Sequence, residues 1–275
     1  MIGDSRPVAV DYELTGPPDA PVVLLANSLG STRQMWDPQV PALTDAGLRV
    51  LRFDTRGHGR SPVPPGPYTI DDLGADVVAL LDQLDLARVH VVGLSLGGML
   101  GMWLAGHAAA RVDRLVLCCT SALLGPPQAW AERAALVRAE GTGAVADAVA
   151  ARWFTPGFAA RQPATVAAAR DMIAATPPEG YAGCCAAIER LDLTGVLRSI
   201  TAPTLVIAGA DDPATPPAHG AAIAVGIPGA TLRVVDDAAH LANVEQSAAV
   251  TRLILAQLTG PTAERTTDAD RSDQW

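Results

Sequence analysis

The sequence contains no lysine, and all 20 of its basic residues are arginine. This absence excludes a lysine Schiff base and a phosphate-binding loop built around lysine. Aromatic residues make up only 4% of the chain, so the core has to be built mainly from alanine, valine, leucine and isoleucine. No stretch of about 18 uncharged apolar residues occurs, and the sequence therefore predicts no membrane-spanning helix.

Positive charge is also scarce. The 20 arginines face 29 acidic residues, which gives a formal net charge of −9 at pH 7, and no run of basic residues occurs. Such a chain is poorly suited to nucleic acid or an anionic membrane surface, because both are polyanions. We expect neither as a partner. The apolar fraction of 49% indicates a globular protein with a sizeable core.

Cysteine occurs only as two adjacent pairs, Cys118-Cys119 and Cys184-Cys185. Neither pair has the C-x-x-C spacing of zinc ribbons and thioredoxin-like centres, so we expect no metal and no redox centre. Residues 1–16 lack the basic and apolar regions of a signal peptide. The resulting expectation is a cytoplasmic protein with reduced, buried thiols.

Seven short runs rich in branched apolar residues have the length of β-strands. They cover residues 8–14, 21–27, 48–54, 88–94, 111–119, 203–209 and 230–236. The second, fourth, fifth and sixth runs are dominated by apolar residues and do not alternate strictly with polar ones. This pattern is typical of parallel strands that are buried on both faces of a sheet.

Stretches of helical length lie between these runs. In residues 70–84, apolar side chains recur at three- and four-residue steps, and aspartates occupy the first turn, as at a helix N-terminus. Residues 245–258 show a similar apolar periodicity. The alternation predicts an α/β fold with a mostly parallel central sheet flanked by helices.

Residues 121–195 interrupt this alternation. The segment is rich in alanine and arginine, contains six prolines and has no strand-like run. We predict that it forms a small helical cap over the carboxyl edge of the sheet, whereas residues 1–120 and 196–260 form the core. Residues 261–275 are polar, and we expect a disordered tail there.

The segment after the fourth run contains a candidate nucleophile. It reads Gly93-Leu94-Ser95-Leu96-Gly97, a G-x-S-x-G sequence between a strand and an apolar helical stretch, which is the setting that exposes a reactive serine. Gly93 and Gly97 lack a Cβ, so the neighbouring chain can pass close to the turn. The N–H of Leu96, at the helix start, is placed to stabilise an oxyanion in front of Ser95. A tight turn with a purely packing role is the alternative.

A serine hydroxyl needs a base to act as a nucleophile at neutral pH. The chain offers five histidines, namely His58, His90, His107, His219 and His240. His240 follows the last strand-like run and precedes the last helical stretch, in the loop where a hydrolase of this fold presents its base. We predict His240 as the base, with His58 in an Arg-Gly-His-Gly turn as the alternative.

The acid that orients this base is expected after residues 203–209. Two adjacent aspartates, Asp211 and Asp212, follow that run. The G-x-x-D-x-x-x-P spacing favours Asp212, and Asp211 is the alternative. Either aspartate could instead cap a helix or close a turn. The carboxylate of such an acid fixes the imidazole tautomer and stabilises the imidazolium.

Together these motifs resemble the α/β-hydrolase superfamily across residues 8–259, in which serine, acid and histidine follow one another in this order. Within it the chain is similar to the 3-oxoadipate enol-lactonases of aromatic-acid catabolism. The segments that carry this closer resemblance are LANSLGSTRQMWDPQVPAL, LRFDTRGHGRSPVPPGPYTIDDLGADV, VHVVGLSLGGMLGMWLA, ATPPEGYAGCCAAI, TLVIAGADDPATPP and DDAAHLANVEQ. The triad motifs are common to the whole superfamily, so the closer resemblance depends on the other segments in combination.

The resemblance implies a serine hydrolase that opens the enol-lactone of 3-oxoadipate through an acyl-enzyme, without a cofactor, in the β-ketoadipate pathway. Many relatives carry His-Gly where this chain has Asn27-Ser28. By that alignment the second oxyanion donor, beside Leu96, is the backbone N–H of Leu29. A backbone donor tolerates side-chain changes, so the departure does not remove it.

The substrate implied by the resemblance is a small anionic lactone. Because the protein is itself anionic, a positive group in the pocket has to offset the repulsion. The arginine candidates are Arg33, Arg133 and Arg138, and the candidates for the pocket wall are Trp36, Trp130 and Trp153. We favour Arg133 or Arg138 as the carboxylate ligand, while a solvated arginine and a core tryptophan are the alternative roles.

Other functions remain open from the sequence. An esterase or a cofactor-free haloperoxidase-like perhydrolase would share the triad and differ in the cap. A ligand-binding or sensing protein of the same fold would bind without turnover, and a non-catalytic scaffold would need no triad. A homo-oligomer and a carboxymuconolactone decarboxylase, which is fused to the enol-lactonase in some bacteria, are the protein partners that the resemblance allows.

Overall fold

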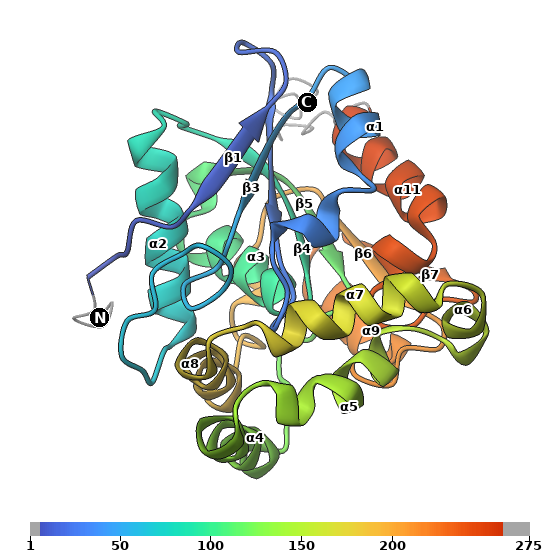
Figure 1. The fold of residues 1–275 in the computed structure, drawn as a ribbon. Coiled ribbons are helices and arrows are strands. Elements are labelled where there is room, and N and C mark those ends of the chain that lie inside the picture. Colours follow the sequence, from blue (N-terminus) through green and yellow to red (C-terminus); the bar gives the residue numbers. More distant parts are fainter. Residues whose placement is uncertain (1–5, 261–275) are drawn as a thin grey trace, which may run out of the picture.

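The computed structural model describes residues 6–260, which form one seven-stranded sheet flanked by helices (Figure 1). The strands are β1 (Tyr12–Thr15), β2 (Val22–Ala26), β3 (Arg49–Phe53), β4 (Val89–Leu94), β5 (Val112–Cys118), β6 (Thr204–Gly209) and β7 (Thr231–Val235). Their order is β1-β3-β2-β4-β5-β6-β7, with β1 antiparallel to β3 and every other neighbouring pair parallel. Six of the predicted runs contain one of these strands, and the first, 8–14, overlaps β1, which begins at Tyr12 and ends at Thr15; the predicted mostly parallel α/β fold is confirmed.

Both faces of this sheet are covered. Helices α1 (Val40–Asp45) and α11 (Ser247–Thr259) lie on one side in Figure 1, and α2 (Ile70–Gln83) and α3 (Leu96–His107) lie on the other. Every residue of β2, β4 and β6 is buried as a result. Their largely apolar sequences are therefore explained by burial on both sides.

The predicted helices begin close to their sequence signals. The Thr69 side chain accepts a hydrogen bond from the Asp72 N–H, and the Asp72 carboxylate accepts one from the Thr69 N–H, which closes a capping box at the start of α2. The predicted stretch 245–258 is divided between two helices, α10 (Ala242–Glu245) and α11. Gln246, between them, has φ −117° and ψ 48° and so leaves the helical conformation.

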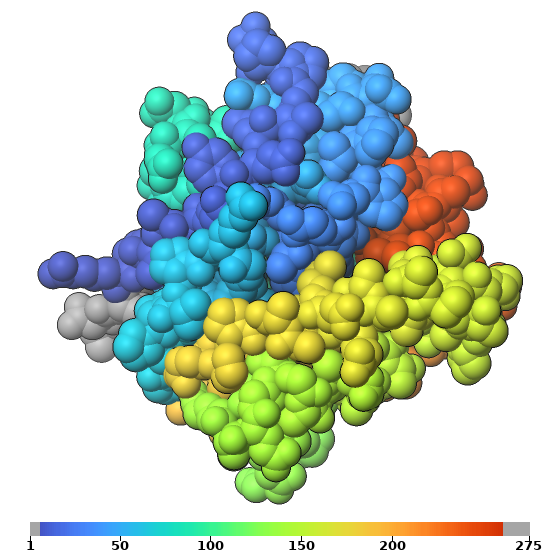
Figure 2. Space-filling model, viewed as in Figure 1, coloured from blue at the N-terminus to red at the C-terminus, as the bar shows by residue number. Residues whose placement is uncertain are grey.

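The segment at residues 121–195 is helical and contains no strand. Its helices are α4 (Pro127–Glu140), α5 (Gly143–Trp153), α6 (Pro156–Arg161), α7 (Pro163–Ala174) and α8 (Pro178–Glu189). Four of them begin at a proline, where the missing N–H costs no helical hydrogen bond. The five helices lie together at the lower end of the sheet in Figure 1 and form a continuous green-to-gold layer in Figure 2. We call this layer the cap.

The remaining elements connect the sheet strands. They are the helix α9 (Pro217–Gly226) and the short 3-10 helices η1 (Arg33–Trp36), η2 (Ala109–Arg111) and η3 (Leu197–Ser199). All four cysteines are buried and free. Within residues 6–260 no helix is long and apolar enough to cross a membrane. The predicted tail at residues 261–275 lies outside the described residues.

The cap meets the core at the turn that follows β3. A Cβ added to Gly57, which has φ +76°, would overlap the backbone of Gly180 on α8, and the reverse substitution would overlap Gly57. An ion pair holds this turn in place: the Nε of Arg56 lies 2.6 Å from Oδ2 of Asp76 on α2. The exposed fractions of these two side chains are 3% and 2%, so the ion pair is fully buried.

We predict that Asp76→Ala lowers the free energy of unfolding by about 3–5 kcal/mol, because it leaves a buried guanidinium without its carboxylate. Urea unfolding followed by circular dichroism measures this loss. The control is Asp147→Ala, which removes a pair with Arg170 whose side chains are 80% and 52% exposed, and it should cost at most about 1 kcal/mol. Equal losses in the two variants would contradict the prediction.

Candidate active site

Ser95 occupies a strained turn between β4 and α3. Its φ of 57° and ψ of −115° lie outside the regions that a serine normally adopts. The turn is held by a hydrogen bond of 3.0 Å from the Ser95 N–H to the Cys118 carbonyl. The Ser95 carbonyl in turn accepts hydrogen bonds from the Met99 N–H (3.0 Å) and the Thr120 hydroxyl (2.7 Å).

Two glycines make this turn possible. A Cβ added to Gly93 would overlap the Gly97 carbonyl, and one added to Gly97 would overlap the Ala26 carbonyl at the end of β2. The backbones of β4, α3 and β2 therefore approach more closely than any other residue would allow. The close chain passage expected from the G-x-S-x-G sequence is present in the fold.

Asp212 and His240 come together at the same edge of the sheet. Oδ2 of Asp212, which follows β6, lies 2.8 Å from Nδ1 of His240, which follows β7. Thr215 contributes its hydroxyl to Oδ2 (2.7 Å) and its N–H to Oδ1 (3.1 Å). Asp211 is exposed and makes no such contact with the histidine. The geometry therefore pairs the imidazole with Asp212.

The Asp212 carboxyl is buried, and burial by itself would raise its pKa. The charge and hydrogen bond of His240 and the two hydrogen bonds from Thr215 outweigh burial, so the pKa of Asp212 is lower than its ordinary value. The group is consequently an anion at neutral pH. It can fix the proton of His240 on Nδ1 and leave Nε2 as the acceptor for a serine proton.

A cavity of about 260 Å³ lies between the core and the cap. Ser95 and His240 both line it, together with Ser28 and Leu29 from the loop after β2. The cap helices contribute Trp130, Arg133, Val149, Arg152, Trp153, Tyr181 and Ile188. The candidate nucleophile and base thus line the same cavity, whose size suits a small ligand.

The loop after β2 supplies the candidate oxyanion donor. Among residues 6–260, the N–H groups of Leu29 and Leu96 have no hydrogen-bond partner. Leu96 is the first residue of α3, where N–H groups are free of helical partners. The Ser31 hydroxyl donates to the Ser28 carbonyl over 2.7 Å, and this carbonyl belongs to the same peptide unit as the Leu29 N–H.

His58, the alternative base, holds this loop instead. Its Nε2 accepts a hydrogen bond of 2.9 Å from the Gly30 N–H, and its Nδ1 lies 3.2 Å from the Arg56 carbonyl. The side chain is buried and does not line the cavity. The three other histidines bond elsewhere, His90 to Asp113, His107 to the Trp103 carbonyl and His219 to the Ser121 hydroxyl.

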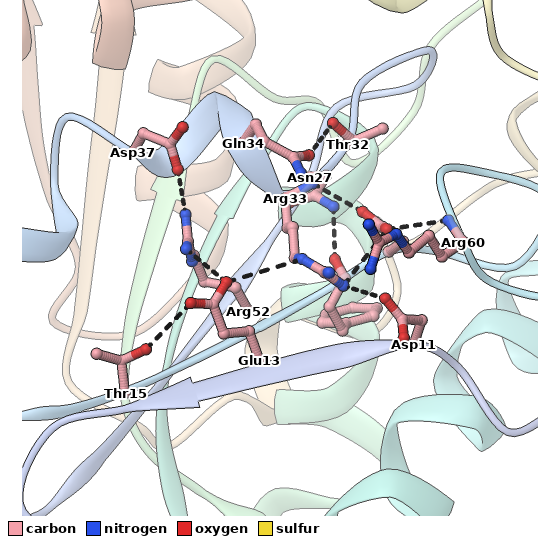
Figure 3. Close-up of polar contacts among 12 residues, drawn as sticks. Asp11, Glu13, Thr15, Asn27, Thr32, Arg33, Gln34, Asp37, Arg52 and Arg60 are labelled. Carbon is pink, nitrogen blue, oxygen red and sulfur yellow. Dashed lines mark hydrogen bonds and ion pairs between the residues drawn. The ribbon is translucent and has the colours of Figure 1, made fainter.

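The prediction that Arg33 contacts the substrate is corrected by the structure. Arg33 is not part of the cavity lining. Figure 3 shows its guanidinium turned toward Asp11 and Glu13, and it also forms an ion pair of 3.6 Å with Asp54. Three carboxylates compensate this one cation, which is why it stays beneath the loop and does not reach into the cavity.

Two further candidates also lie away from the cavity. Trp36 is completely buried in the core, and Arg138 forms a bidentate pair with Glu179 at 2.8 and 3.0 Å on the exposed side of α4. Neither lines the cavity. Of the predicted substrate contacts, three line the cavity: Trp130, Arg133 and Trp153.

Among the cavity residues that were not predicted from the sequence are Arg152 on α5 and Tyr181 on α8. A signal for Arg152 exists, because Val149, Arg152 and Trp153 share one helix face at steps of three and four residues. Tyr181 has no comparable signal. It reaches the cavity only because α8 packs beside α4.

The buried imidazole of His58 generates a prediction about pH. Burial lowers the pKa of His58 below 6.5, although the Arg56 carbonyl and Asp54 act in the opposite direction. The unfolded chain therefore binds a proton here before the folded chain does, so this contribution to stability is complete above about pH 6.5 and declines as the pH falls below it. The free energy of unfolding should fall by up to about 1.4 kcal/mol per pH unit from this group.

The measurement is urea unfolding at about pH 7.5 and about pH 5.5, where the imidazole changes charge in the unfolded chain. In His58→Gln, which does not titrate, the decline should be smaller than in the original protein. Some decline should persist, because burial also lowers the pKa of His90. The same decline in both proteins would show that His58 is not the responsible group.

Comparison with known proteins places this geometry in a family. The model of the alpha/beta hydrolase fold family matches residues 21–247. The chain is 42% identical to 3-oxoadipate enol-lactonase 2 of Acinetobacter baylyi over 92% of its length and 94% of the relative. It is 44% identical to the crystal structure of the enol-lactonase from Burkholderia xenovorans LB400, with a TM-score of 0.89 over 91% of this chain and 96% of that one.

A third similarity extends to a different activity. A thermophilic esterase from Thermogutta terrifontis, solved with malate bound, is 33% identical with a TM-score of 0.84 over 89% of this chain and 91% of that one. The matched fold in each case is the sheet-and-cap architecture described above. The chain therefore belongs to the alpha/beta hydrolase fold family.

Proposed function

We propose that this hydrolase opens the enol-lactone of 3-oxoadipate to 3-oxoadipate by way of a covalent acyl-serine. The single observation that supports the mechanism most is the shared cavity of Ser95 and His240, with His240 bonded to Asp212 over 2.8 Å. The similarity to two enol-lactonases supports the substrate. The β-ketoadipate pathway and a cytoplasmic location belong to the same proposal.

In the first half of the reaction, the Ser95 hydroxyl attacks the lactone carbonyl while Nε2 of His240 takes its proton. The carbonyl oxygen becomes an oxyanion that the N–H groups of Leu29 and Leu96 stabilise. Because these donors are free of other partners, they need no rearrangement to receive the charge. Each donor contributes about 3 kcal/mol to lowering the barrier.

Collapse of the tetrahedral intermediate breaks the ring C–O bond and releases an enolate, which takes up a proton and tautomerises to the ketone. The enolate is a better leaving group than a simple alkoxide, and tautomerisation makes ring opening hard to reverse. His240 then activates a water molecule, which cleaves the acyl–serine ester and restores the hydroxyl of Ser95.

The charge of the cavity supports an anionic substrate. Arg133 is the arginine among the predicted contacts that lines the cavity, and its guanidinium stacks on the Trp130 ring at 4.6 Å from the centroid. The malate-bound esterase shows that a relative of this architecture accommodates a dicarboxylate. An esterase acting on neutral substrates is the competing function, favoured by that relative's activity.

We predict that Ser95→Ala lowers kcat for the enol-lactone by about four to six orders of magnitude, because the nucleophile is lost while the cavity remains. The lactone is generated in situ, and the disappearance of its ultraviolet band gives the rate. The matched control is Ser61→Ala, a buried serine outside the cavity whose loss should leave kcat within a few-fold of the original.

Four outcomes would each overturn part of the proposal. Disappearance of the band at the uncatalysed rate with the original protein would reject the enol-lactone as substrate, and faster turnover of small neutral esters would favour the esterase. Equal rates for Ser95→Ala and the original protein would reject Ser95 as nucleophile. A persistent acyl adduct after a single turnover would favour a ligand-sensing role.

A further inference from the structure

Two arginines face the cavity without a counterion. Arg133 on α4 and Arg152 on α5 both line it, and among residues 6–260 neither forms an ion pair with a carboxylate. Burial and the positive charge of Arg133 lower the pKa of Arg152. Asp212 attracts Arg152 only from a distance, because that carboxylate is committed to His240 and Thr215. This side of the cavity therefore carries uncompensated positive charge.

A buried hydroxyl lies in the same wall. Tyr181 is completely buried, and in the described part of the chain its Oη makes no hydrogen bond of good geometry, although the Arg133 guanidinium lies close enough to act on it as a donor and to lower its pKa. Burial raises the pKa of Tyr181 to about 12, with Arg133 and Arg152 acting in the opposite direction, so the phenol keeps its proton and can donate it. An unpartnered buried hydroxyl is costly, and a ligand acceptor would remove that cost.

The donors in this wall are held in place. The Arg133 guanidinium rests on the Trp130 ring, and the Tyr181 ring packs against Gly30, where an added Cβ would lie 2.9 Å from the tyrosine Cε2. Both contacts orient the donors without satisfying them. Ser95 and His240 line the same cavity.

We propose that Arg152, Arg133 and Tyr181 form a subsite for a carboxylate, and that this subsite selects esters and lactones that carry a carboxylate away from the reacting carbonyl. The inference rests on the proposed function for the place of the reacting carbonyl. A planar anion with several acceptor sites fits two guanidinium groups and one hydroxyl better than a neutral group does. Positive charge from the cap also offsets the repulsion that an acidic protein exerts on an anionic substrate.

The test compares two esters of equal chain length, the para-nitrophenyl monoester of adipate and para-nitrophenyl hexanoate, which differ in a terminal carboxylate. Arg152→Gln should raise KM for the adipate ester by about 10- to 100-fold and Tyr181→Phe by about tenfold, with little change in KM for the hexanoate. Arg138→Gln removes the same charge from α4 outside the cavity and should leave both values unchanged. Free adipate should inhibit hexanoate hydrolysis competitively, and less strongly in Arg152→Gln.

The subsite is overturned if Arg152→Gln and Tyr181→Phe change KM equally for the two esters, or change neither. Tighter inhibition by inorganic phosphate than by adipate would show that the subsite binds anions in general and does not select a carboxylate. Because hexanoate hydrolysis that depends on Ser95 does not require the subsite, its persistence separates failure of this inference from failure of the proposed function.

A second observation concerns His58, which contacts the loop after β2 that carries the candidate oxyanion donor Leu29. We call this loop the oxyanion loop. The Nε2 of His58 accepts the Gly30 N–H at 2.9 Å, one residue beyond the candidate donor Leu29. Its Nδ1, at 3.2 Å from the Arg56 carbonyl, faces an acceptor and therefore carries the ring proton. Arg56 is itself fixed by the buried Asp76. The His58 imidazole thus connects the loop after β2 to the turn after β3, and that same turn contacts the cap at Gly57 and Gly180.

We infer that His58 is a positioning residue that sets the orientation of the Leu29–Gly30 peptide and, through it, the direction of the Leu29 N–H. This inference also rests on the proposed function. Gly30 has φ +78°, a conformation that the loop can leave in several directions once the hydrogen bond is lost. A shift of about 1 Å at an oxyanion donor is enough to reduce catalysis by up to about 10²-fold.

Two variants separate positioning from folding. In His58→Gln the amide oxygen can replace Nε2 as acceptor, whereas His58→Asn can keep only the contact with the Arg56 carbonyl. We expect His58→Asn to lower kcat for para-nitrophenyl acetate by about 10- to 100-fold with KM little changed, and His58→Gln to recover most of the loss. Affinity for phenylboronic acid, which forms a tetrahedral adduct with the serine, should fall in parallel with kcat.

Thermal unfolding of both variants provides the structural control. Equal kcat in His58→Asn and the original protein would overturn the inference, as would a loss of kcat in both variants without any loss of boronate affinity. Activity of the original protein and its absence in Ser95→Ala are unaffected by either result, so the proposed function is judged separately.

Discussion

The close approach of three backbones at the turn between β4 and α3 is the constraint on which the rest of the site depends. Gly93, Gly97 and Ala26 leave no room for a further atom, and this crowding holds Ser95 at a positive φ that a free chain would avoid. The strained turn puts the serine at the carboxyl edge of the sheet and starts α3 directly behind it. A free N–H at Leu96 follows from the same geometry, because the first turn of a helix has no internal partners. The strain is sustained by hydrogen bonds from neighbouring strands and by a sheet buried on both faces.

The distribution of charge shows how an acidic protein can accommodate an anion. Seven arginines of the described residues form ion pairs with carboxylates, as Arg56 does with Asp76 and Arg33 does with three carboxylates. Arg133 and Arg152 differ because no carboxylate of the described chain pairs with them. They belong to cap helices, whereas the candidate nucleophile and base belong to the core. A change in the cap can therefore alter the preferred substrate while the triad stays the same.

The sequence predicted the elements of the fold and the order of the triad because these depend on local patterns. Apolar runs of strand length, a G-x-S-x-G turn, and an aspartate and a histidine in the loops after two late strands are each visible within a few residues. The substrate contacts were predicted less well, because proximity in sequence says nothing about side-chain direction. Arg33 lies close to the loop after β2, but its side chain points to Asp11 and Glu13. Arg138 lies five residues beyond Arg133 on α4 and pairs with Glu179 outside the cavity.

The amino-acid sequence by itself determined the alternation of strands and helices, the glycines that permit the strained turn and the supply of arginine as the only cation. These properties are local or compositional, and each can be read without knowing what lies opposite. The sequence spacing favoured Asp212, and the tertiary structure brought it and not Asp211 into contact with His240. Tertiary structure alone decided that His58 holds the loop after β2, and that Arg152 and Tyr181 line the same cavity as Arg133. Those pairings join residues far apart in the chain, and only the packing of the sheet, its loops and the cap helices brings their side chains within reach of one another.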